Sequence, residues 1–139
     1  QIPGAGYTAA TAWTDYFQGS YPEQYTLLKS TGELMELNYT TSGRMWVSVR
    51  TGVVKAIGAG HSLYSLENYG WLYFLGDGGN PATDWTLVTN QIRDFATDGA
   101  TNLYIKSDGT LWASGYNGGM YGDGTTDDDP AMKRIHLPN

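Results

Sequence analysis

The feature that most constrains this sequence is a β-hairpin pattern that occurs three times. Its clearest copy spans residues 102–117, where two runs of β-branched, aromatic and aliphatic residues meet at Asp108-Gly109. An Asp-Gly pair favours the tight hairpin turn, which requires positive φ angles. Weaker copies span residues 25–37, with Gly32 at the turn, and residues 63–76, with Gly70 at the turn. A chain that repeats one short unit is predicted to fold as several copies of one small sheet.

Aligning the copies on their turn glycines brings similar side chains together at a spacing of 38 and 39 residues. The aligned columns are Leu28, Leu66 and Ile105; Leu34, Leu72 and Leu111; and Met35, Tyr73 and Trp112. The register continues past the hairpins, because Trp46 and Trp85 are 39 residues apart. Each unit therefore has room for an entry strand before its hairpin and an exit strand after it. Four strands per unit are typical of a β-propeller blade.

The limits of the repeats suggest two segments. Residues 1–12 show no strand or helix periodicity and are interpreted as an N-terminal arm, whereas residues 13–139 are predicted to form the repeat domain, with the first entry strand at residues 13–16. Met132 and Ile135 are expected to close the third unit. Glu36 stands where Phe74 and Ala113 stand in the other units, which predicts either an exposed or partnered face of the first unit or a slip of the alignment there.

Composition narrows the class of function. The 139 residues carry a formal net charge of −6, so nucleic acid and anionic membranes are unfavourable partners. There is no apolar run of membrane-spanning length. The chain has no cysteine and two histidines, His61 and His136, at different repeat positions, and it lacks the Gly-x-Ser-x-Gly nucleophile motif. We therefore expect neither an enzyme nor a bound cofactor.

Residues 103–126 resemble the repeat of the RCC1 family of β-propellers. The similarity rests on Lys-Ser-Asp-Gly-Thr at 106–110, Leu-Trp-Ala at 111–113, Gly-Tyr-Asn at 115–117 and Gly-Asp-Gly-Thr-Thr at 122–126. The short period is similar to that of bacterial propellers of this superfamily that bind proteins. The resemblance implies an all-β fold with about three RCC1-like four-stranded blades, which form a partial β-propeller.

Three blades do not complete a propeller, because closed propellers have roughly four to eight blades. A row of three sheets would expose an apolar face at each end, and exposed apolar faces favour association. We therefore predict a homo-oligomer, with two chains and six blades as the simplest closed arrangement.

Candidate binding residues are aromatic and polar side chains at or beside the turns. Flat rings next to amide groups can stack on sugars or anchor a protein partner, although packing between blades is an equal alternative for each ring. These candidates are Tyr39, Tyr69, Trp71, Tyr116, Asn117 and Tyr121. The predicted function is a self-associating protein-interaction module outside a cell or on a virion surface; the alternative is a carbohydrate-binding receptor-recognition domain.

The acidic loop at residues 122–129 is the one candidate for metal binding. It contains four carboxylates, and oxygen-rich loops can bind calcium. It lacks the ligand spacing of an EF-hand. We therefore interpret it as a solvated loop and predict no metal site.

Replacing Tyr116 and Tyr121 by alanine is expected to weaken ligand binding while the fold stays intact, because surface rings contribute contact area rather than core packing. A glycan array and circular dichroism measure the two effects. Loss of folding in these variants would instead identify the rings as core residues.

Overall fold

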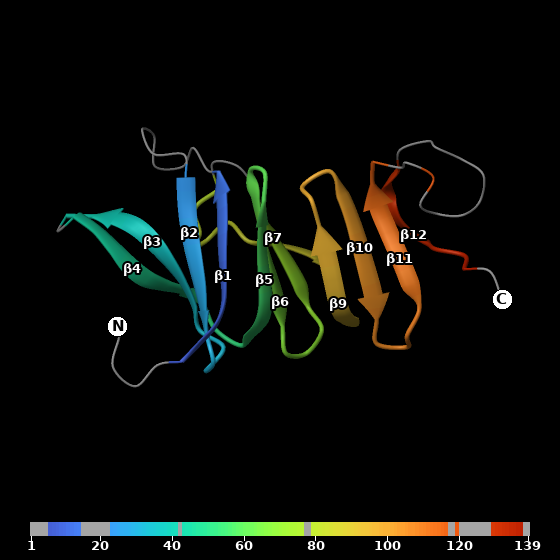
Figure 1. The fold of residues 1–139 in the computed structure, drawn as a ribbon, viewed down its shortest axis with the longest axis horizontal. Coiled ribbons are helices and arrows are strands. Elements are labelled where there is room, and N and C mark those ends of the chain that lie inside the picture. The colour runs from blue at the N-terminus through green and yellow to red at the C-terminus, as the bar shows by residue number, and fades with distance from the viewer. Residues whose placement is uncertain are drawn as a thin grey trace. The chain divides into compact units, whose positions relative to one another are not determined.

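The computed structural model describes residues 6–14, 23–41, 43–76, 79–116, 119 and 129–137. These residues form twelve strands in three four-stranded antiparallel sheets and contain no helix (Figure 1). By its internal contacts the chain divides into two compact units, Gln1–Asn90 and Gln91–Asn139. The first unit holds two sheets and the second unit holds one. The all-β prediction of three four-stranded blades is confirmed.

The first sheet is a meander of four strands in the order β1-β2-β3-β4. Its strands are β1 (Tyr7–Thr14), β2 (Glu23–Lys29), β3 (Leu34–Thr40) and β4 (Gly43–Arg50). Each strand pairs with the next one along the chain. Short antiparallel strands joined in sequence are what a hairpin-rich sequence favours.

The second sheet repeats this topology with the order β5-β6-β7-β8. Its strands are β5 (Val53–Ala59), β6 (Ser62–Glu67), β7 (Leu72–Leu75) and β8 (Thr86–Thr89). Both sheets therefore place their middle two strands in the predicted hairpin.

The third sheet forms the second unit, in the order β12-β11-β10-β9. Its strands are β9 (Ile92–Thr97), β10 (Thr101–Lys106), β11 (Leu111–Gly115) and β12 (Asp129–Arg134). Met132 lies in β12, and the Ile135 amide donates to the Leu111 carbonyl at 2.8 Å, so both residues belong to the closing strand region as expected.

The pairing registers confirm the alignment of the repeats. Two of the aligned columns face each other across the hairpin in every sheet. The cross-strand pairs are Leu28 with Leu34, Leu66 with Leu72, and Ile105 with Leu111. The turn glycines also adopt similar positive φ angles, of 88° at Gly32, 84° at Gly70 and 86° at Gly109. Because L side chains rarely adopt these angles, glycine is the residue that each turn requires.

The first entry strand does not lie where the sequence placed it. We expected it at residues 13–16, after an arm of residues 1–12, whereas β1 runs from Tyr7 to Thr14 and pairs with β2 from Glu23 to Lys29. One strand therefore crosses the expected boundary between arm and repeat domain. Small Ala and Thr side chains obscured its alternation, because they give little hydrophobic contrast between the two faces of a strand.

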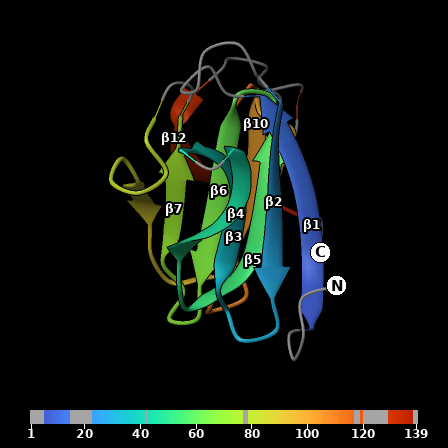
Figure 2. The ribbon, with the colours of Figure 1, turned by 90° about the vertical axis from the view of Figure 1, so that its left-hand side faces the viewer.

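The first two sheets pack face to face in the first unit. The contact buries Trp13 and Leu28 of the first sheet against Leu63 and Leu75 of the second. In Figure 2 the strands of the first sheet lie in front of β5, β6 and β7. Each buried Leu side chain of this kind contributes about 2 kcal/mol of hydrophobic stabilisation.

A close backbone approach joins β1 to β5 at Gly58. A Cβ at this position would lie 2.7 Å from the Trp13 Cβ and 2.8 Å from the Ala12 carbonyl oxygen. The Gly58 amide also donates to the Thr11 hydroxyl oxygen at 2.8 Å. Glycine is therefore required here by the space between the two strands and not by its φ angle.

Glu36 resolves the ambiguity at its repeat position. It pairs with Thr26 across the strands, in the register that the alignment requires, so the alignment does not slip there. Its side chain is fully buried, beside the buried Gln24 and Thr26, on the face of the first sheet that packs against the second. The first sheet is therefore partnered on the Glu36 face.

Gly58→Ala is expected to destabilise the chain by about 1–3 kcal/mol, because the added methyl group overpacks the contact between β1 and β5. Urea denaturation measures the free energy of unfolding. Gly6→Ala is the matched control, since its new Cβ would meet its nearest neighbour, the Ser30 hydroxyl oxygen, at 3.4 Å. Equal stability of the two variants would contradict the close approach.

Acid is expected to destabilise the hairpin at Asp108. Hydrogen bonds from the Thr110 side chain and then the Thr110 backbone hold the Asp108 pKa below its usual 3.8. A carboxyl whose pKa is lower in the folded chain stabilises the fold above its unfolded-state pKa, and this stabilisation is lost as the pH falls through the folded-state value. Thermal melting at decreasing pH should therefore show a smaller acid loss in Asp108→Asn than in the original chain; identical pH dependence would contradict this.

Candidate interaction surface

The first sheet has two different faces because side chains alternate along each strand. One face carries Trp13, Leu28 and Leu34 and packs against the second sheet. We call the opposite face the outer face. It comprises Ala10, Ala12, Tyr25, Leu27, Met35, Leu37 and Trp46, which are cross-strand partners or lie at alternate positions on the same strands.

The outer face is apolar and partly open to solvent. Tyr25 exposes 44% of its surface, Leu27, Leu37 and Trp46 are half-buried, and Met35 is buried. Ala10 and Ala12, which pair with Leu27 and Tyr25, are exposed. Contiguous exposed apolar side chains of this kind mark interaction sites on soluble proteins.

The second sheet has an equivalent face, and that face is covered. The repeat alignment and the strand registers match Tyr25 with Leu63, Leu37 with Leu75, and Trp46 with Trp85. Leu63 and Leu75 are fully buried against the first sheet, and Trp85 packs on the same core. The outer face is thus the first sheet's copy of a surface that the second sheet uses for blade-to-blade packing.

An arginine strengthens the covered contact between the first two sheets. Arg50 of β4 forms an ion pair with Glu67 of β6, and its guanidinium lies 4.0 Å from the centre of the Tyr73 ring and 5.0 Å from that of Trp85. Both partners of the ion pair are largely buried, so solvent screens the attraction less than at the surface. Cation–π contacts of this type contribute roughly 0.5–2 kcal/mol.

The outer face also carries an arginine. The Arg44 guanidinium lies 5.8 Å from the centre of the Tyr25 ring, and its Nη2 donates to the Glu23 carbonyl oxygen at 3.3 Å. A cation beside an exposed ring gives this apolar surface one positively charged edge.

Two of the predicted binding residues lie together in the hairpin between β6 and β7. Tyr69 exposes 84% of its surface and Trp71 exposes 47%. The Trp71 ring is tilted against the Tyr73 ring, with centroids 6.5 Å apart. Exposed rings in one turn fit the predicted surface role, and that role stays a prediction.

The other predicted residues are placed in part. Tyr116 follows β11 in the second unit and is 58% exposed, and its amide donates to the Ala100 carbonyl oxygen at 3.0 Å. Tyr39 lies in β3 opposite Arg44, and its side chain is outside the described part of the chain. Asn117 and Tyr121 lie outside the described residues. Within each sheet, Tyr39 and Tyr116 lie at the end of the third strand, whereas Tyr69 and Trp71 lie at its start.

The outer-face residues were missed as individual candidates. The sequence predicted open end faces but directed attention to aromatic residues at turns. The signal that identifies the outer face is present, because Leu27, Met35 and Leu37 alternate with side chains that face the core. The alternation by itself does not show which of these two sets of side chains meets a neighbouring sheet.

The described residues provide no candidate metal cluster. Within them, no group of three or more His, Cys, Asp or Glu side chains could hold a metal ion. Residues 122–128 of the candidate calcium loop are outside the described part of the chain. In the same described part, no helix has the length and apolar character needed to cross a membrane.

Comparisons with solved structures identify the architecture. Human WBSCR16 aligns with a TM-score of 0.67 and 14% identity, over 99% of this chain and 41% of the human protein. Two structures of yeast RCC1 (Prp20), one bound to Kap60 and the other of the protein from Saccharomyces cerevisiae, align over 84% of this chain with TM-scores of 0.59 and 0.62 and identities of 17% and 16%. This chain spans 34% and 35% of those proteins.

No protein-family model matches the sequence, and no curated protein matches it. The similarity is therefore carried by the fold, and it agrees with the hairpin motifs of residues 103–126. The three four-stranded sheets have the fold of RCC1-like β-propeller blades, and the chain corresponds to part of such a propeller.

Proposed function

We propose that this chain is a non-enzymatic protein-interaction module of RCC1-like blades that self-associates through the outer face. One observation carries the proposal. The outer face of the first sheet, with Tyr25, Leu37 and Trp46, repeats the pattern with which the second sheet packs on the first, namely buried Leu63 and Leu75 and partly buried Trp85. A surface built for blade packing and left open favours association with another sheet.

Blade number supports the same proposal. Propellers close with roughly four to eight blades, and the described residues form three. A second copy supplies three more sheets under two-fold symmetry, the commonest symmetry of homo-oligomers. Self-association thus covers apolar area without a new kind of interface.

Protein partners are also supported by the structural neighbours. In one structure yeast RCC1 (Prp20) is bound to Kap60, and the other concerns the binding of Prp20p to Gsp1p and histones. These are protein ligands on the same fold, so we propose a protein ligand for this chain as well. The location outside a cell or on a virion surface stays a prediction.

Carbohydrate binding is a second candidate function. The observation in its favour is the pair of exposed rings, Tyr69 and Trp71, in the turn between β6 and β7. Sugars stack on such rings, and neighbouring Asn68 adds an amide that can form hydrogen bonds. Binding on a glycan array that is lost on mutation of Tyr69 would favour this candidate.

Leu27→Asp is expected to convert the self-associated chain to a monomer, because a buried, unpaired carboxylate at the interface costs roughly 3 kcal/mol, about a hundredfold in the dissociation constant. Sedimentation equilibrium measures the mass. Leu87→Asp, at a half-exposed position in β8, is the control and should keep the original mass. A monomeric original chain at high concentration would contradict self-association.

A further inference from the structure

The outer face has a bulky side chain where the covered face has a smaller one. In the contact between the first two sheets, Leu63 and Gly58 of the second sheet are cross-strand partners. In the first sheet the equivalent partners are Tyr25 and Ala12. Ala12 stands where Gly58 allows β1 and β5 to approach, so a sheet docked on the outer face cannot come as close as the first sheet comes to the second. It must also leave more space opposite Tyr25 than the first sheet leaves opposite Leu63.

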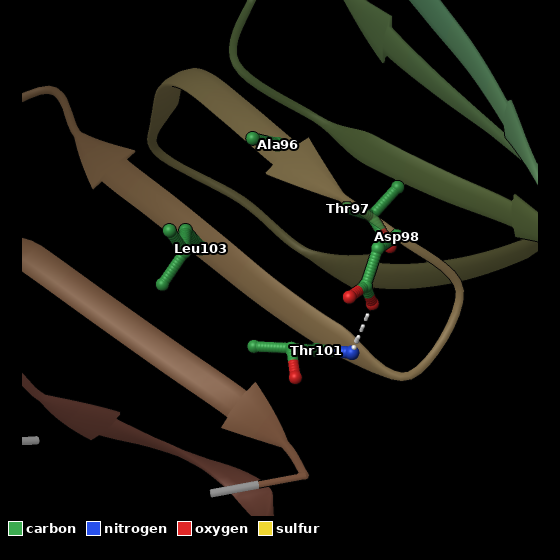
Figure 3. A pocket seen from close by; sticks show the side chains of 5 residues that line it. All are labelled: Ala96, Thr97, Asp98, Thr101 and Leu103. Atoms are coloured by element: carbon green, nitrogen blue, oxygen red, sulfur yellow. Dashed lines mark hydrogen bonds between the residues drawn. The ribbon is translucent and has the colours of Figure 1, made fainter. Parts of the chain in front are cut away.

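The third sheet has this space. We call the face with Ala96, Thr101, Leu103, Ile105 and Leu111 the Leu103 face, and the repeat alignment makes it equivalent to the core-facing side of the first sheet. Its pocket of about 270 Å³ is lined by Ala96, Thr97, Asp98, Thr101 and Leu103 (Figure 3).

The pocket exists because a small side chain replaces a large one. Trp13 pairs with Gln24 in the first sheet, and the strand registers place Asp98 of the third sheet at the position of Trp13. The Trp13 indole is buried and donates to the Thr26 hydroxyl oxygen at 3.2 Å. Leu103 occupies the Thr26 position, so the site has neither the indole nor its hydrogen-bond acceptor.

The two differences are complementary in size. The pocket of about 270 Å³ is an open depression in the surface and not an enclosed cavity. Its volume exceeds the roughly 150 Å³ of a cavity that holds a benzene ring, so a phenol ring can lie in it. Resting on the proposed self-association, we propose that two copies of this chain dock head to tail around a two-fold axis, with the outer face of each copy on the Leu103 face of the other and Tyr25 lying in the Asp98–Leu103 pocket.

Charge complementarity favours this pairing. The Asp98 Oδ1 accepts hydrogen bonds from the amides of Ala100 at 2.9 Å and Thr101 at 2.8 Å, so the second carboxylate oxygen can accept from a guanidinium. Arg44 lies beside Tyr25 and would arrive at the pocket with it. Two outer faces packed on each other would instead bring two Arg44 side chains together, and like charges oppose that arrangement.

Engineered cysteines test the proposal directly, because the chain has no cysteine of its own. Ala12→Cys and Ala96→Cys replace exposed residues and keep Tyr25 and Leu103 in place. They are the repeat equivalents of Gly58 and Thr11, which contact each other between the first two sheets. A disulfide requires Cβ atoms roughly 4 Å apart. Mixing the two variants under mild oxidation should give at least tenfold more crosslinked dimer than mixing Ala12→Cys with Tyr69→Cys.

Three outcomes would overturn the proposal, and they separate it from self-association itself. Crosslinking of Ala12→Cys mainly to itself would show that two outer faces meet. Absence of the mixed crosslink, when sedimentation finds an oligomer, would show that copies associate through other surfaces. A monomeric original chain would overturn self-association and this docking together.

A double-mutant cycle provides an independent measurement. Arg44→Gln and Asp98→Asn should each raise the dissociation constant about tenfold, and the double variant should show no further tenfold loss. The side-chain amide introduced by Asp98→Asn keeps an oxygen that can accept from the Ala100 and Thr101 amides, so the turn is retained. Fully additive effects would overturn the contact between Arg44 and Asp98.

Discussion

Face-to-face contact between β1 and β5 is the constraint on which the first unit depends. Gly58 allows the two strands to approach so closely that even a methyl group would collide with Trp13 and Ala12. This approach lets the Trp13 indole close one side of a core that also holds Leu63 and Leu75. This contact explains why each of the two sheets carries apolar side chains on the face that meets the other.

Polar groups take part in this packing and do not only surround it. Glu36, Gln24 and Thr26 are buried on the packed face of the first sheet, and the ion pair between Arg50 and Glu67 joins the two sheets. Hydrogen bonds and ion pairs depend on direction, whereas apolar contacts do not. These polar groups therefore favour one relative position of the two sheets over others. The outer face, with Arg44 beside Tyr25, has the same combination of apolar area and one cation.

Much of the fold could be predicted from the sequence, and particular residues show where prediction failed. Gly32, Gly70 and Gly109 predicted three hairpins correctly, because turn chemistry is local. The predicted start of strand β1 was about six residues too late, because its Ala and Thr side chains hide the alternation. The outer face was expected only as an open end, because a strand with two apolar faces does not reveal which one meets another sheet.

The sequence by itself determined the repeat, the position of each hairpin turn and the pairing of Leu28 with Leu34 and of its counterparts, because these depend on neighbouring residues and on the two-residue period of a strand. Only the tertiary structure decided that Gly58 meets Trp13, that Leu63 is covered while Tyr25 is open, and that a pocket lies beside Asp98. These features depend on which face of a sheet is covered by another sheet. The physical reason is that such contacts join segments far apart in the chain, and the local sequence pattern does not specify them.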